Sequence, residues 1–122
     1  MLLLDTHVFI WWREARHLSE AASALISEAE TVHVSLVSAW EIAIKQAFGK
    51  LRLDADFRDG VRDSGFELLA IDYEHVQAVR TLPHHHRDPF DRLLVAQAMT
   101  EGLTLVTRDR VFSGYQVPIL WA

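Results

Sequence analysis

Short apolar runs alternate with longer amphipathic stretches along this chain, and this alternation restricts the possible folds most strongly. The runs at 2–4, 31–35, 67–71, 103–107 and 116–120 have strand character. Helical patterns near 8–12, 19–29, 39–48, 54–62, 73–80 and 89–100 separate them, and we expect Gly102 to end the last of these helices. Apolar strands separated by helices are typical of a parallel sheet covered on both faces. We therefore predict an α/β fold, a three-layer α/β/α sandwich with a central parallel sheet of four to five strands, formed by residues 1–122 as one domain.

Composition excludes several classes of function. The chain has no Cys, which rules out disulfides, thiolate catalysis and Cys-bound zinc. Its net charge of −5 argues against a protein that coats nucleic acid by neutralising phosphates. A nucleic-acid substrate is still compatible with this acidity if a bound metal supplies positive charge. The N-terminal apolar run meets Asp5 too soon for a signal peptide, and no run approaches the ~20 residues of a membrane helix. We expect a cytoplasmic protein that does not bind membranes.

Four acidic residues are the candidate functional groups. Asp5 ends the first predicted strand and Asp109 follows the fourth, so both fall at the edge where ligands bind in such sheets. Glu41 and Asp91 lie near the starts of two predicted helices, on apolar faces. For Glu41 the apolar stripe is expected to contain Val37, Trp40, Ile44 and either Ala47 or Phe48.

Each acid also has a purely structural interpretation. Glu41 fits a capping box with Ser38 as the N-cap, and Asp91 fits position N3 of a helix that Asp88 caps and Pro89 begins. Asp5 and Asp109 could cap the elements that follow them. All four together are harder to explain this way, because clustered carboxylates repel one another without a cation. Oxygen ligands alone favour Mg²⁺ or Mn²⁺ over zinc.

Four segments resemble the PIN domain, and within that family the VapC-type toxins of bacterial toxin–antitoxin pairs. They are Leu3-Leu4-Asp5-Thr6, Ser38-Ala39-Trp40-Glu41-Ile42-Ala43-Ile44-Lys45 with Gly49-Lys50-Leu51, His86-Arg87-Asp88-Pro89-Phe90-Asp91-Arg92-Leu93-Leu94, and Leu105-Val106-Thr107-Arg108-Asp109. The resemblance implies an endoribonuclease dependent on Mg²⁺ or Mn²⁺ that leaves 5′-phosphate and 3′-hydroxyl ends. It also implies that Asp5, Glu41, Asp91 and Asp109 bind the metal and carry catalysis, with Thr6 and Thr107 as polar neighbours. The implied partners are RNA, a cognate antitoxin and a second copy of the chain.

Other interpretations remain beside this one. A catalytically inactive PIN-like scaffold that binds RNA or a protein is the main alternative. A haloacid-dehalogenase-like phosphatase would need an Asp where His7 stands, and the glycines form no phosphate-binding loop. The adjacent His84, His85 and His86 are expected to lie on an exposed loop rather than to form a metal site, because neighbours on a loop point in different directions.

Basic and aromatic side chains suggest where partners bind. Lys45, Lys50, Arg52, Arg87, Arg92, Arg108 and Arg110 lie near the acidic motifs and are candidates for contacts with RNA phosphates. For each of them, a solvated surface charge is the simpler interpretation. The run from Val8 to Trp12 is apolar nearly all round the helix, so we expect the antitoxin to bind there.

Overall fold

The protein has a five-stranded parallel sheet in the order β3-β2-β1-β4-β5. Its computed structural model describes residues 1–53 and 55–122. The strands are β1 (Leu2–Leu4), β2 (Val32–Ser35), β3 (Glu67–Leu69), β4 (Thr104–Thr107) and β5 (Ile119–Trp121). β1 lies at the centre, where Leu3 pairs with His33 on one side and Leu105 on the other. The predicted parallel sheet is confirmed, in its five-stranded form.

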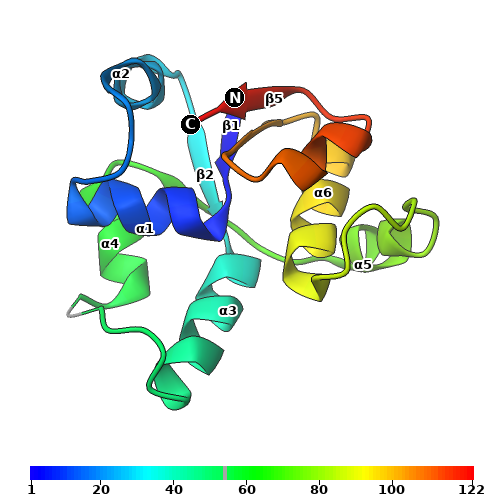
Figure 1. The fold of residues 1–122 in the computed structure, drawn as a ribbon, viewed down its shortest axis with the longest axis horizontal. Helices are drawn as coiled ribbons and strands as arrows, with labels where there is room; N and C mark the ends of the chain where they lie inside the picture. Colours follow the sequence, from blue (N-terminus) through cyan, green and yellow to red (C-terminus); the bar gives the residue numbers. More distant parts are fainter. Residues whose placement is uncertain (54) are drawn as a thin grey trace.

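Helices cover both faces of this sheet (Figure 1). The helices α1 (Thr6–Glu14), α2 (Glu20–Glu28) and α4 (Phe57–Asp63) lie on one side, and α5 (Tyr73–Val79) and α6 (Pro89–Glu101) on the other. The remaining helix, α3 (Leu36–Ala47), follows β2 directly and continues beyond the carboxyl end of the strands. A short 3₁₀ helix, η1 (Arg110–Gly114), was not predicted. The three-layer α/β/α architecture is confirmed.

Two hydrophobic cores hold the layers together, because successive strand side chains point to opposite faces. Leu2 and Leu4 pack with residues of α1, α2 and α4, whereas Leu3 and Leu105 pack against α6. All four of these leucines are buried. The sheet is consequently largely apolar on both faces, and apart from His33 within β2 its polar side chains lie at the ends of the strands.

The N-terminal apolar run is largely absorbed by the first core. Val8, Phe9 and Ile10 are buried there. The next two side chains are half-buried and have polar partners: the indole Nε1 of Trp12 donates to Ser64 Oγ at 3.2 Å, and the guanidinium of Arg108 stands 4.4 Å above the Trp11 ring.

No helix in the described part of the chain is long and apolar enough to cross a bilayer.

The capping residues predicted from the sequence can be compared with the helix ends in the structure. Asp88 is the N-cap of α6, Pro89 occupies its first turn, and Gly102 ends the helix with a φ of 67°, as predicted. The assignment of Ser38 as the N-cap of the Glu41 helix was wrong, because α3 begins three residues earlier and Ser35 caps it. The Ser35 hydroxyl accepts the Val37 N–H at 2.9 Å.

The predicted apolar stripe of α3 was wrong in part. Its buried face contains Val37, Glu41 and Ile42. Trp40 and Phe48 are instead 52% and 76% exposed. The helix is rotated in this way because its polar Glu41 faces inward, toward the other acids.

Two further boundaries moved. Residue 54, where we predicted that a helix begins, lies outside the described residues. The helix α4 begins at Phe57, and the Asp56 side chain caps it by accepting the Asp59 N–H. The strand predicted at 116–120 is β5 at Ile119–Trp121. Pro118 precedes it, and its carbonyl accepts the Leu105 N–H at 2.9 Å.

Candidate metal centre

Asp5 stands at the junction of β1 and α1, at the carboxyl edge of the sheet. It is 5% exposed. Its Oδ1 accepts the Val8 N–H at 2.8 Å, which caps α1, and its Oδ2 accepts the Thr107 hydroxyl at 2.5 Å. Burial raises the pKa of the Asp5 carboxyl above its usual value, although these two hydrogen bonds act in the opposite direction. Strands β1 and β4 are thus linked at the point where each one ends.

Glu41 reaches the same edge from α3. Thr6 and Ser38 connect α1 to α3 through a buried hydrogen bond of 2.9 Å between their hydroxyls. Glu41 itself is 4% exposed, and its Oε2 receives the Lys45 ammonium at 2.9 Å. Its Oε1 is buried and accepts no hydrogen bond from the described residues. Because a buried carboxylate oxygen without a partner is costly, this atom is an open ligand position.

Asp91 is the residue on which the other acids converge. Burial raises the pKa of its carboxyl to about 8, and repulsion from Asp88, Glu41, Asp5 and Asp109 adds to the increase. Its side chain is 20% exposed. At neutral pH, without a cation, the cluster therefore holds a proton at Asp91. The structure places Asp5, Glu41 and Asp109 close enough to raise the Asp91 pKa, but of these four acids only Asp91 and Asp109 belong, with His86, to a group of three described residues whose ligand atoms lie within 4.8 Å of one another.

Asp109 lies at the outer side of the cluster. It follows β4, is 42% exposed at its side chain, and caps η1 by accepting the Val111 N–H at 3.0 Å. His86 bridges it to Asp91: the His86 Nε2 lies 3.0 Å from Asp91 Oδ2 and 3.0 Å from Asp109 Oδ2. These three ligand atoms lie within 4.8 Å of one another.

Sequence reasoning missed this role of His86. His84 and His85 are exposed, as expected for a loop. The same expectation was wrong for His86, whose side chain is only 15% exposed. Its spacing from the helix start could have indicated the contact, because His86 precedes the N-cap Asp88 by two residues and accepts the Asp88 N–H through Nδ1 at 3.2 Å.

Several basic residues near the motifs have partners inside the protein. Arg92 is buried and donates to the carbonyls of Pro83, Val79 and Leu82, so it is structural. Arg108 and Arg110 lie over the rings of Trp11 and Trp121. Lys45 pairs with Glu41, the interaction expected for an i, i+4 pair. Lys50, Arg52 and Arg87 are exposed, as are Arg108 and Arg110.

The donor set fits a divalent cation. The carboxylates of Asp5, Glu41 and Asp109 lie near enough to Asp91 to raise its pKa, and Glu41 Oε1 is buried without a hydrogen-bond donor among the described residues. Carboxylate oxygens are the ligands that Mg²⁺ and Mn²⁺ prefer. A cation also offsets the repulsion that raises the Asp91 pKa.

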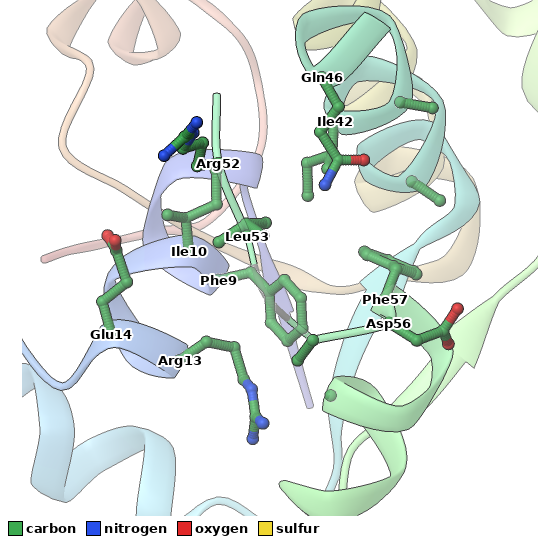
Figure 2. Close-up of a pocket in the computed structure, with 14 residues that line it drawn as sticks. Phe9, Ile10, Arg13, Glu14, Ile42, Gln46, Arg52, Leu53, Asp56 and Phe57 are labelled. Atoms are coloured by element: carbon green, nitrogen blue, oxygen red, sulfur yellow. The ribbon is translucent and has the colours of Figure 1, made fainter. Parts of the chain in front are cut away.

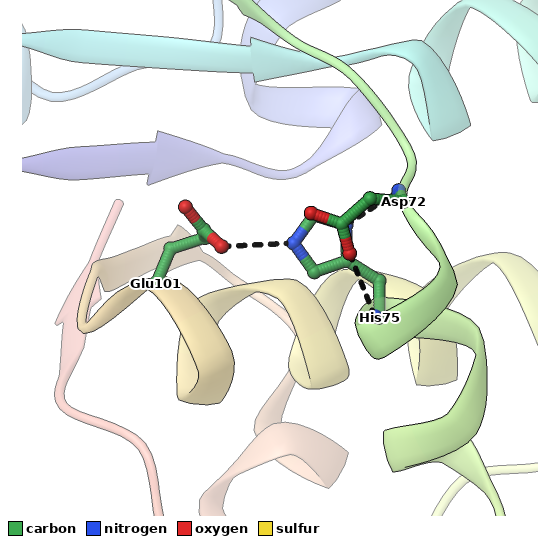
Figure 3. Close-up of side chains that lie close together, drawn as sticks. All are labelled: Asp72, His75 and Glu101. Atoms are coloured by element: carbon green, nitrogen blue, oxygen red, sulfur yellow. Dashed lines mark hydrogen bonds and ion pairs between the residues drawn. The ribbon is translucent and has the colours of Figure 1, made fainter.

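A second group of titratable side chains lies at the opposite end of α6 (Figure 3). His75 is 1% exposed; its Nδ1 accepts the Asp72 N–H at 3.0 Å, and its Nε2 lies 3.1 Å from Glu101 Oε2. The Asp72 carboxylate accepts the His75 N–H in return, which completes a capping box. Both ring nitrogens thus have protein partners, and the group connects α5 to the last residue of α6.

An apolar groove opens between α1, α3 and α4 (Figure 2). Its volume is about 440 Å³. Phe9 and Ile10 of α1, Ile42 of α3, and Leu53 and Phe57 form its apolar walls. The charged side chains of Arg13, Glu14, Arg52 and Asp56 also line it.

The sequence matches the model of the PIN domain family over residues 2–117. The chain therefore belongs to the PIN domain family. It is similar to the protein named Ribonuclease VapC22 of Mycobacterium tuberculosis, with 33% identity over 129 residues, which cover 96% of this chain and 93% of that protein.

Solved structures share the fold at low sequence identity. VapBC2 of Rickettsia felis, solved bound to a DNA fragment from its promoter, gives a TM-score of 0.74 at 15% identity, covering 98% of this chain and 97% of the other. A toxin–antitoxin complex of Klebsiella pneumoniae gives a TM-score of 0.69 at 21% identity, covering 98% and 96%. At these identities, the two structures support the three-layer architecture.

Proposed function

We propose that this protein is a metal-dependent endoribonuclease whose active site contains Asp5, Glu41, Asp91 and Asp109. The observation that carries this proposal is the acidic environment of Asp91, whose pKa is raised to about 8 by burial and further by the carboxylates of Asp88, Glu41, Asp5 and Asp109. Such strongly perturbed groups cluster at functional sites. The similarity to a protein named as a ribonuclease supports RNA as the substrate.

The four carboxylates would hold Mg²⁺ or Mn²⁺, which when bound polarises the scissile phosphodiester and lowers the pKa of a water molecule. The chain's own residues prepare the site for this. Thr107 and the Val8 N–H fix the two oxygens of Asp5, so that this carboxylate is oriented before any ligand arrives. Asp91 holds a proton in the metal-free site and gives it up when positive charge enters. The exposed Lys50 and Arg87 are available to contact flanking phosphates.

Purified protein is expected to cut single-stranded RNA in Mg²⁺ or Mn²⁺ and to stop when EDTA is added, because the carboxylates alone provide no positive charge for the phosphate. Gel assays on a labelled RNA measure the cleavage. Mapping of RNA ends after a brief pulse of expression should find new 5′-phosphate ends. Protein carrying Asp5→Asn is the inactive control, and RNA cleavage that survives both EDTA and Asp5→Asn contradicts the proposal.

An inactive scaffold that binds RNA is the competing function. It predicts RNA binding without new ends and without any dependence on a divalent cation. The open Oε1 of Glu41 argues against it, because a site selected only for stability would pair or remove that buried oxygen. The end-mapping experiment separates the two functions directly.

We further propose that the protein is a toxin whose antitoxin places an amphipathic segment in the groove between α1, α3 and α4. The similar Klebsiella pneumoniae structure is itself a toxin–antitoxin complex. The groove offers Phe9, Ile42 and Phe57 as apolar contacts and charged side chains for a polar flank. We also propose a homodimer as the working form and the cytoplasm, where RNA is accessible, as its location.

A charged side chain in the groove should block the antitoxin. Ala43→Glu places a carboxylate in the groove, whereas Ala47→Glu changes an exposed residue one turn further along α3 and outside the groove. We expect Ala43→Glu to weaken copurification of the co-expressed antitoxin by at least about tenfold, since an unpaired charge would have to be desolvated. Ala47→Glu should bind normally. Equal binding by both variants contradicts the groove assignment, and light scattering of the free protein tests the homodimer separately.

A further inference from the structure

His86 is the one imidazole that contacts the acidic cluster in the described chain, and the proposed reaction does not yet use it. Its Nε2 lies 3.0 Å from carboxylate oxygens of both Asp91 and Asp109. A histidine among carboxylates has two different possible roles. It either offers a nitrogen lone pair to a metal or donates a hydrogen bond to the carboxylates that hold one.

The hydrogen bond at the other ring nitrogen decides between these roles. The Asp88 backbone N–H donates to His86 Nδ1 at 3.2 Å. A backbone N–H is always a donor, so Nδ1 must present its lone pair, and the proton of the neutral ring is on Nε2. Nε2 therefore faces the two carboxylates as an N–H donor and has no lone pair for a metal.

Two further contacts fix the position of His86. It packs on the Phe112 ring with 5.3 Å between centroids, and the His86 backbone N–H donates to the Tyr115 hydroxyl at 2.9 Å. Asp88, which sets the His86 tautomer, also caps α6 by accepting the Phe90 and Asp91 N–H groups. The turn at Asp88 thus fixes both the His86 ring and Asp91, which is one of the two carboxylates that the ring contacts.

We propose that His86 is a positioning residue: its Nε2–H donates a hydrogen bond to Asp109 Oδ2, and the fixed ring holds Asp91 Oδ2 beside it at 3.0 Å, so that both carboxylates present their ligand atoms to the cation. The inference rests on the proposed function, because it assumes that this cluster binds a divalent ion. Partners that orient metal ligands in this way typically change metal affinity by about 10–100-fold when removed. His86 acts through the two acids and does not itself ligate the ion.

The test compares His86→Leu, which keeps apolar bulk against Phe112, with His86→Gln, whose amide can restore a donor. His84→Gln, on the exposed part of the same loop, is the matched control. Calorimetric titration with MgCl₂ and with MnCl₂ measures affinity without any RNA. We expect His86→Leu to bind each ion about 10–100-fold more weakly than wild type, with a similar loss for Mg²⁺ and for Mn²⁺. His86→Gln should recover most of this affinity, and His84→Gln should match wild type.

Two results overturn the inference. Unchanged affinity in His86→Leu means that the imidazole does not position the carboxylates. A loss much larger for Mn²⁺ than for Mg²⁺ means that His86 is a direct nitrogen ligand, since imidazole favours the transition metal. If His86→Leu does not fold by circular dichroism, His86→Ala takes its place.

Asp5→Asn, measured beside these variants, separates the inference from the function on which it rests. If wild type binds neither ion, the metal centre itself is wrong. If wild type binds and Asp5→Asn loses affinity while His86→Leu does not, only the role of His86 is wrong.

Discussion

Asp91→Asn is expected to reduce RNA cleavage to below about 1% of wild type and, at the same time, to stabilise the metal-free protein. Cleavage falls because a neutral amide supplies less charge to the cation that activates water and phosphate. Stability rises because the folded metal-free protein must either protonate the mostly buried Asp91 carboxyl or bear its repulsion from Asp88, Glu41, Asp5 and Asp109. An amide of nearly the same shape removes that repulsion. The two effects have opposite signs, and a merely structural residue would not produce both.

Asp5→Asn, Glu41→Gln and Asp109→Asn should lose cleavage to a similar extent, because all four side chains would hold the same ion. Cleavage is measured at saturating Mn²⁺ on one RNA, and unfolding is measured by differential scanning calorimetry with EDTA. For a chain of this size, a gain of about 1 kcal/mol would raise the Tm of Asp91→Asn by roughly 4 °C. Glu28→Gln, at an exposed residue of α2, serves as the control. The site assignment is wrong if two of the four variants retain near-wild-type cleavage.

The second large effect is a pH dependence that a cation reverses. The folded-state pKa of Asp91 is raised from 3.8 to about 8, so between these values the native protein binds the Asp91 proton more tightly than the unfolded chain does. The Asp91 contribution to the unfolding free energy is therefore greatest at low pH, falls as pH rises through this window, and levels off above about pH 8. Asp5, whose pKa is also raised, acts in the same direction.

The metal-free Tm should therefore fall between about pH 5.5 and pH 8.5, and roughly 1 mM Mn²⁺ should restore it most strongly at the alkaline end. Because the ion displaces the Asp91 proton, its apparent affinity should rise by about tenfold per pH unit below pH 8. Calorimetry at pH 7 in two buffers of different ionisation enthalpy should detect release of about one proton. Asp91→Asn should flatten this dependence. A metal affinity that does not change with pH below pH 8 would refute the linkage.

The parts of the fold that follow from local chemistry were predictable from the sequence. Apolar runs located the strands, and Asp88-Pro89 and Gly102 located the ends of α6, because capping depends on neighbouring residues alone. Asp5 and Asp109 were singled out because the carboxyl ends of parallel strands share one edge, and Glu41 and Asp91 because each lies on the apolar face of a predicted helix. The start of α3 was not predictable in this way. Ser35 and Ser38 can both cap a helix, and the buried contact between Ser38 and Thr6 of another helix decides between them.

The exposure of Trp40 and the position of His86 depend on contacts that are distant in sequence. Periodicity predicts that α3 has a buried face, but the burial of Glu41 beside acids from three other segments determines which face it is. Likewise, nothing in three consecutive histidines indicates which one turns inward. His86 does so because its ring packs on Phe112 and its backbone N–H reaches Tyr115, both more than twenty residues away.

Asp5 and Asp109 both begin a helical element with the carboxylate that faces the cluster. Alanine at either position would remove the side-chain acceptor of the cap, typically at a cost of about 0.5–2 kcal/mol, together with the negative charge. Asparagine keeps one oxygen that can accept the cap hydrogen bond, and it removes the charge together with the second acceptor oxygen. A single-nucleotide change converts an aspartate codon into an asparagine codon. Under the proposed function, the shortest genetic route to an inactive version of this chain therefore leads to a folded protein that still binds the proposed antitoxin.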